Sequence, residues 1–153
     1  MGYMFFLMDS YSTADCCISR PVSFDFWKYI VSKVLETATD FEIRCWPDEM
    51  CSFALGERYG TKINNTETKE VVYRGRTSKA FADEVLSDHL SENGTLKWFT
   101  LNLTVGANTI FHSGHYGTEL VLYRIREEQK AEIQKWAESY PEIKWVDYFP
   151  EEV

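Results

Sequence analysis

The stretch that decides the fold runs from residue 98 to residue 125 and reads WFTLNLTVGANTIFHSGHYGTELVLYRI. Over residues 98–105, Phe, Leu, Leu and Val alternate with Trp, Thr, Asn and Thr, so one face of a strand is apolar and the other is largely polar. Turn-forming residues at 106–108 and 113–117 separate this run from two more extended runs. We therefore expect a three-stranded antiparallel meander.

Working outward, short apolar or alternating runs predict further strands at residues 3–8, 41–46, 52–55, 71–73 and 143–149. Helical spacing of apolar residues predicts helices over 24–38, 78–90 and 126–140, with Ser23 and either Thr77 or Ser78 as N-caps. Residues 9–22 read as a loop. The expected fold class is α+β: a mostly antiparallel sheet of about five to seven strands with about three helices packed against it.

The length of 153 residues suits one globular domain, residues 1–153. Hydrophobic residues make up 44% and charged residues 26%, which excludes a disordered chain. Ten Phe, nine Tyr and five Trp are present. Most of these rings are expected in the core, and Tyr and Trp are also the preferred anchors of binding surfaces.

No stretch has the basic start and long apolar core of a signal peptide, and none has the length of a membrane span. We therefore expect a cytoplasmic protein that does not bind membranes. In that compartment Cys16, Cys17, Cys45 and Cys51 are expected to be reduced, with no disulfide. No sequence motif indicates a cofactor or a metal.

The formal net charge of -8 opposes binding to nucleic acid or anionic lipid and favours a basic partner. Residues 57–80 reverse this balance, with six bases against three acids and a local net of +3. One interpretation is an anion-binding loop; the other is a solvated polar hairpin whose bases pair with the acidic surface. The residues of the anion-binding loop would be Arg58, Lys62, Arg74 and Arg76.

Two histidines bracket a glycine turn in His112-Ser113-Gly114-His115, and Glu119 follows four residues later. One interpretation is a pair of histidines that binds zinc with a carboxylate, or that serves as acid and base in a ribonuclease-like hydrolysis, although the His-Glu-x-x-His motif is absent. The structural alternative is that His112 ends a strand and His115 lies in a polar turn. Known hydrolase and nucleotide-binding motifs are missing, so an enzyme is the less favoured class.

In size, charge and composition the chain resembles the immunity proteins that bacteria use to block a cognate toxin, which is often a cationic nuclease. The leading hypothesis is therefore a small acidic inhibitor or immunity-type protein that neutralises a basic protein partner. The alternatives are a small hydrolase or metal-dependent enzyme using His112, His115 and Glu119, and a subunit of a homodimer or larger assembly paired through residues 143–149. Acids and rings near the end of the chain are the expected partner-binding residues: Glu127, Glu128, Trp145, Asp147, Tyr148, Glu151 and Glu152.

Overall fold

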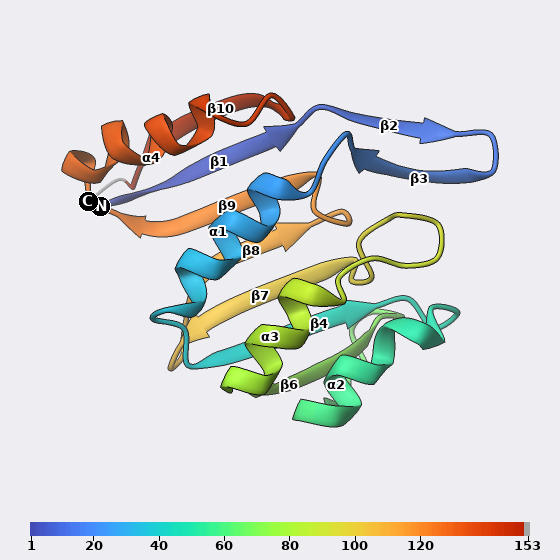
Figure 1. The fold of residues 1–153 in the computed structure, drawn as a ribbon. Coiled ribbons are helices and arrows are strands. Elements are labelled where there is room, and N and C mark those ends of the chain that lie inside the picture. The colour runs from blue at the N-terminus through green and yellow to red at the C-terminus, as the bar shows by residue number, and fades with distance from the viewer. Residues whose placement is uncertain (152–153) are drawn as a thin grey trace.

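The computed structural model describes residues 1–151, and its architecture is α+β with one large antiparallel sheet (Figure 1). Within these residues eight strands form that sheet. They are β1 (Gly2–Met8), β4 (Asp40–Cys45), β5 (Gly60–Ile63), β6 (Val71–Arg76), β7 (Thr100–Val105), β8 (Asn108–Gly114), β9 (Glu119–Ile125) and β10 (Ile143–Pro150). Their order across the sheet is β10-β1-β9-β8-β7-β4-β6-β5, so the first strand lies between the last two.

The predicted meander is confirmed, because β7, β8 and β9 are consecutive neighbours in the sheet. The alternation of apolar and polar residues predicted for residues 98–105 is also seen in the burial of the side chains of β7. Leu101 and Leu103 are fully buried, whereas Asn102 and Thr104 between them are half-buried on the opposite face.

Among the described residues four α-helices lie on one face of the sheet, in front of it in Figure 1. They are α1 (Asp25–Leu35), α2 (Ala54–Tyr59), α3 (Lys79–Ser87) and α4 (Lys130–Glu138), with short 3-10 turns η1 (Met50–Phe53) and η2 (Glu127–Gln129) before α2 and α4. The predicted apolar face of α1 is the buried one, and Trp27 and Ile30 from it enter the core. In residues 1–151 no helix has the length and apolar character needed to cross a bilayer.

The sheet is larger than expected, and two local predictions were wrong. Residues 9–22 are not a loop: β2 (Ser10–Thr13) and β3 (Cys16–Pro21) pair as a separate hairpin that projects from one end of the molecule (Figure 1). All four residues of β2 are exposed, so no hydrophobic alternation marked it as a strand.

Residues 52–55, predicted as a strand, belong to η1 and α2, which adds the fourth helix. The strand that pairs with β6 is β5 instead. In this helix Leu55 and Gly56 are buried, and Gly56 lies directly against the Tyr73 ring, where a Cβ would come within 2.3 Å of Tyr73 Cγ.

The face of the sheet opposite the helices is named the open face here. A line of directly paired residues crosses all eight strands on this face, since residues paired in adjacent strands point to the same side. From β10 to β5 the line runs Asp147, Phe5, Val121, His112, Asn102, Glu42, Arg74 and Thr61.

Candidate functional site

One half of the open face carries a cluster of aromatic side chains, named the ring cluster. Tyr3 pairs directly with Phe149, and their rings stack with centroids 5.2 Å apart. Phe5 contacts Trp145 at 5.6 Å, and Tyr3 contacts Tyr123 at 6.2 Å. The members of the cluster are Tyr3, Phe5, Tyr123, Trp145 and Phe149.

The ring cluster is separate from the hydrophobic core. The core lies between the sheet and the helices and contains Met4, Phe6 and Met8 from β1, whereas none of the five clustered rings packs against it. Trp145 is 43% exposed and the other four rings are half-buried. The cluster is therefore a partly exposed apolar surface with Trp145 as its most exposed ring.

The seven predicted partner-binding residues do not form one surface. Trp145 and Asp147 lie on the open face beside Phe5, as expected of alternate residues in β10. Tyr148 points to the other side, where its hydroxyl donates to the Ile125 carbonyl at 3.3 Å.

The acidic members of that set lie apart from these rings. Glu127 and Glu128 are exposed on η2, and Glu128 pairs with Arg126 at 2.9 Å. Glu151 follows β10 and is exposed, and Glu152 lies outside the described residues. Of the six members of the set that the structure describes, therefore, only Trp145 and Asp147 are brought to the open face.

Sequence reasoning missed four of the five clustered rings. The signal was present in β1, where residues 3–8 are apolar at every position rather than at alternate ones. A strand that is apolar on both faces is normally covered on both. Here the helices cover the side of Met4 and Phe6, and the side of Tyr3 and Phe5 stays open.

The other half of the open face contains a polar cleft of about 310 Å³, named the histidine cleft. It lies over β4, β7, β8 and the start of β9. The residues that line it are Arg44, Glu70, Phe99, Thr100, Asn102, His112, Gly114, His115 and Glu119.

A hydrogen-bonded relay fixes the orientation of His112 in this cleft. Asn102 Nδ2 donates to Glu42 Oε1 at 3.2 Å, and Asn102 Oδ1 lies 2.6 Å from His112 Nδ1. A carboxylate only accepts hydrogen bonds, so it orients the amide of Asn102 with its oxygen toward His112. His112 must then carry its proton on Nδ1, and Nε2 is left as an acceptor.

Burial lowers the pKa of His112 below the ordinary histidine value. The nearby Glu119 carboxylate opposes this shift without cancelling it. At neutral pH the imidazole is therefore neutral, with the lone pair of Nε2 available.

Glu42 is held as a carboxylate. Burial alone would raise its pKa, but hydrogen bonds and ion pairs with Arg44 and Arg74, at 2.8 and 2.6 Å, bring the pKa below the ordinary value. Arg44 is shared with a second carboxylate, Glu70, at 3.5 Å. The arginines at this end of the relay are thus already paired with acids.

The three residues of the predicted histidine site all line the histidine cleft. His115 Nε2 lies 3.7 Å from Glu119 Oε2, and His115 sits in a turn with φ of 48°. His112 lies within β8 rather than at its end. In the described part of the chain no group of three or more His, Cys, Asp or Glu side chains is arranged to hold a metal ion.

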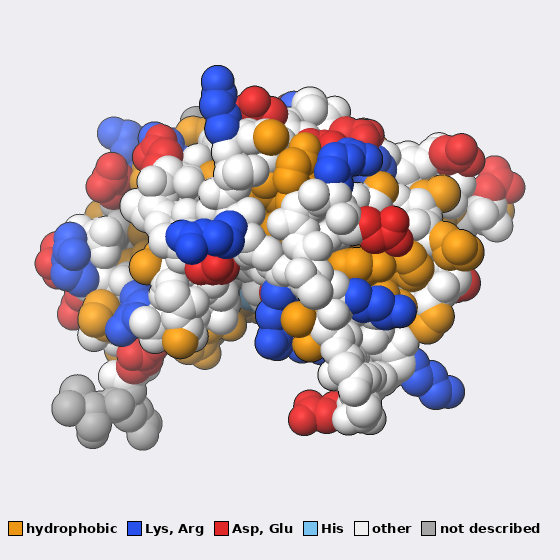
Figure 2. All heavy atoms as spheres, turned by 90° about the horizontal axis from the view of Figure 1, so that it is seen from below, with side chains coloured by type: hydrophobic (Ala, Val, Ile, Leu, Met, Phe, Trp, Pro, Cys, Tyr) orange, Lys and Arg blue, Asp and Glu red, His pale blue; other side chains and the backbone are white. Residues whose placement is uncertain are grey.

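The four residues of the predicted anion-binding loop do not converge. Arg58 on α2 pairs with Glu84 of α3, and Arg74 pairs with Glu42 on the open face. Arg74 and Arg76 line one hollow together with Asp40 and Glu42, and Lys62 lines another. Figure 2, which views the molecule from the side of α2 and β6, shows basic and acidic side chains interleaved with hydrophobic ones.

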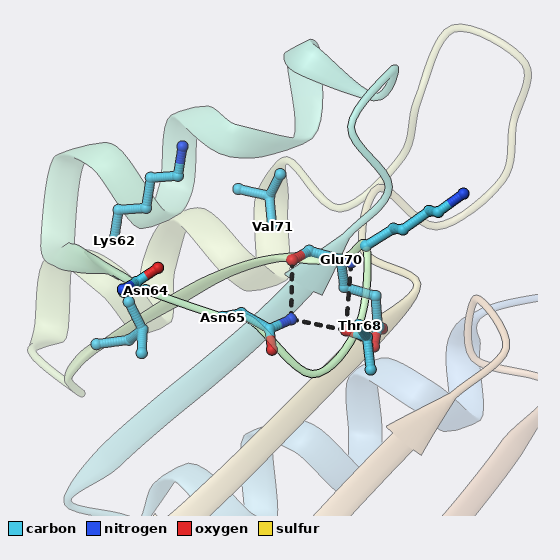
Figure 3. A pocket seen from close by; sticks show the side chains of 8 residues that line it. Lys62, Asn64, Asn65, Thr68, Glu70 and Val71 are labelled. Atoms are coloured by element: carbon cyan, nitrogen blue, oxygen red, sulfur yellow. Dashed lines mark hydrogen bonds between the residues drawn. The ribbon is translucent and has the colours of Figure 1, made fainter.

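The loop between β5 and β6 has its own internal order. Asn65 Nδ2 donates to Thr68 Oγ1 at 2.6 Å and to the Glu70 carbonyl at 3.0 Å (Figure 3). These bonds close the loop and hold Glu70 at the edge of the histidine cleft, where it meets Arg44.

Comparison of the chain with models of protein families, with curated proteins and with solved structures finds no match.

Proposed function

We propose that this chain is a small binding protein whose open face holds a basic protein partner, in the manner of an inhibitor or immunity-type protein. The observation that carries the proposal is the ring cluster, which lies on the open face outside the hydrophobic core. Tyr and Trp, which dominate the energetics of protein interfaces, supply three of its five rings.

Burial of these rings against a partner would remove apolar surface from water, and this contributes roughly 25 cal/mol per Å². Because Tyr3, Phe5 and Trp145 contact one another or shared neighbours, they would be buried together as one patch. Packed aromatic patches at the centre of an interface carry most of its binding energy.

The preference for a basic partner follows from charge. The chain carries a net charge of -8, and Asp147 and Glu119 pair directly with Phe5 and Leu7 beside the ring cluster. Acids around an apolar patch accelerate the approach of a basic partner and fix its orientation.

The test compares Trp145→Ala with Tyr11→Ala as the matched control. Both rings are similarly exposed, 43% and 44%, but Tyr11 lies on the separate β2–β3 hairpin. Each tagged variant and the wild type are used to capture partners from the native cell, and the recovered proteins are quantified by mass spectrometry.

The proposal expects one stoichiometric basic protein that wild type and Tyr11→Ala retain and Trp145→Ala loses. Asp147→Lys should weaken the same association by like-charge repulsion. A partner that is acidic, or that binds Trp145→Ala as well as wild type, would contradict the proposal.

The two alternative functions would use other parts of the structure. β10 is at an edge of the sheet, and a mass that doubles with concentration would indicate a homodimer paired through it. A hydrolase would use His112 Nε2 as a base toward water, and the described lining of the histidine cleft contains no Ser or Cys nucleophile.

A further inference from the structure

We propose that the histidine cleft is a binding site for a guanidinium group, which an arginine side chain of the partner inserts between His112, Glu119 and Phe99. The arginine would come from the basic protein proposed above, so the source of the ligand rests on that proposed function. The chemistry of the site itself is argued from the cleft alone.

The histidine cleft presents hydrogen-bond acceptors to a ligand. The Glu42–Asn102 relay places the proton of His112 on Nδ1, so Nε2 accepts a hydrogen bond and makes none to another described residue. Glu119 pairs directly with Gly114, over which the His112 ring lies, so its carboxylate is a second acceptor on the same side. A ligand that only donates hydrogen bonds satisfies both, and arginine is such a ligand.

One side of the histidine cleft is aromatic. Phe99 lines the cleft and is held by edge contacts with His115 at 5.3 Å and Tyr116 at 5.2 Å. Trp46 supports it from another side at 5.1 Å. Phe99 thus brings an aromatic ring into the lining of the cleft, and guanidinium packs on aromatic rings better than ammonium does.

The charged side chains of the histidine cleft favour a cation over an anion. Arg44 lies in the cleft but is engaged by both Glu42 and Glu70, so it neither strongly repels a cation nor is free to clamp an anion. Within residues 1–151 the one ion pair of Glu119 is with His115, whose Nε2 lies 3.7 Å from Glu119 Oε2. An incoming cation therefore finds a carboxylate that no arginine or lysine neutralises at present.

The experiment uses N-acetyl-arginine methylamide as the probe and N-acetyl-citrulline methylamide, its neutral isostere, as the matched control. Long-range ¹H–¹⁵N spectra of the histidine rings report the tautomer of His112 and its change on titration. We expect the Nδ1–H tautomer in the free protein, and a saturable shift of His112 Nε2 with arginine at a Kd of about 1–10 mM, as suits a small fragment. Citrulline should bind at least about ten-fold more weakly, since it lacks the charge.

Matched variants locate the site. Glu119→Gln should weaken binding of the arginine probe by about ten-fold, the effect of losing one charge-assisted hydrogen bond. Asp83→Asn removes an exposed acid on α3, on the helix side of the molecule, and should leave the affinity unchanged. Inorganic phosphate serves as the anionic probe and should not shift His112.

Three results would overturn the assignment: equal binding of citrulline and arginine, a saturable shift of His112 with phosphate, or no shift with arginine up to about ten times the expected Kd. These results are independent of the capture experiment. If the arginine probe binds but no basic partner is captured, the proposed function alone is contradicted. If a basic partner is captured and its binding is lost in Trp145→Ala but kept in Glu119→Gln, the arginine site alone is contradicted.

Discussion

Gly114 provides the space that His112 occupies. A Cβ on Gly114 would meet His112 Nε2 at 2.6 Å, which is the free end of a side chain that can turn away. Gly114→Ala should therefore change the free energy of unfolding by less than about 1 kcal/mol but break the contact between His112 and Asn102. Denaturant unfolding measures the first, and the ¹⁵N shifts of the His112 ring measure the second.

Gly56→Ala is the comparison variant. Its Cβ would come within 2.5 Å of Tyr73 Cβ, which cannot move without moving β6. We expect a loss of stability of about 1–3 kcal/mol or more. If Gly114→Ala proved the more destabilising of the two, the described position of His112 over Gly114 would be wrong.

Glu42 gives stability that depends on pH. Its pKa is lower in the folded protein than the ordinary value of about 4.3, so the ionised form stabilises the fold above that pH, and the contribution is lost as the pH falls through the lowered folded pKa. Glu42→Gln should lower the free energy of unfolding by about 1–3 kcal/mol at pH 7. The difference from wild type, followed by urea unfolding from pH 7 to pH 3, should shrink below about pH 4. A difference that stays constant over this range would contradict the ionic role.

The sequence could suggest the histidines but not the relay that orients them. His112 and His115 stand out because they flank a glycine turn, and Glu119 follows close behind. Glu42 and Asn102 lie next to His112 because β4, β7 and β8 pair in a register that places these three residues side by side. Glu42 is 60 positions before Asn102 in the sequence. A single sequence contains no direct signal of such register.

At the scale of elements, two helices are capped in different ways. Ser78 caps α3 locally, with its hydroxyl accepting from the Phe81 amide at 3.1 Å, as its position in the sequence predicts. The start of α1 is capped from a distance: the buried carboxylate of Glu142 accepts from the Phe26 amide at 3.0 Å. Ser23, the predicted N-cap, accepts from the Asp25 amide instead, one residue before the assigned cap, Phe24.

Substitutions at the two caps should differ in effect. Ser78→Ala should lower the free energy of unfolding by about 1 kcal/mol. Glu142→Ala should lower it by about 2–4 kcal/mol, because it leaves a buried amide unsatisfied and removes a side chain that links α1 to the start of β10. Hydrogen exchange of the first turn of α1 checks the mechanism, and unchanged protection there in Glu142→Ala would contradict it.

Helices and strands whose apolar residues recur at a regular spacing were predicted well, and those without such a spacing were not. The helical faces of α1 and α3 and the alternation of β4 and β7 were all read from apolar spacing. The β2–β3 hairpin was missed because all four residues of β2 are exposed and Pro21 is the one buried residue of β3, so apolar spacing does not mark the pair. The short α2 was misread as a strand because three or four residues do not distinguish the two periods.

At the scale of the whole molecule, the chain contains two apolar regions with different roles, and adjacent residues of β1 separate them. Phe6 is fully buried in the core, whereas Phe5 lies in the ring cluster on the open face. Phe6→Ala should lower the free energy of unfolding by about 3–5 kcal/mol, and Phe5→Ala by about 1 kcal/mol or less. Thermal and urea unfolding of both variants measure this, and equal losses would mean that the ring cluster serves stability rather than binding.

The position of β1 also has a consequence for synthesis of the chain. Both of its neighbours, β9 and β10, lie in the last third of the sequence, so β1 has no strand partner until residues 119–150 have been synthesised. The ring cluster draws its members from these same strands and therefore assembles last. Until then the apolar β1 is an unpaired edge exposed to other chains, a state that favours aggregation and that nascent-chain chaperones protect.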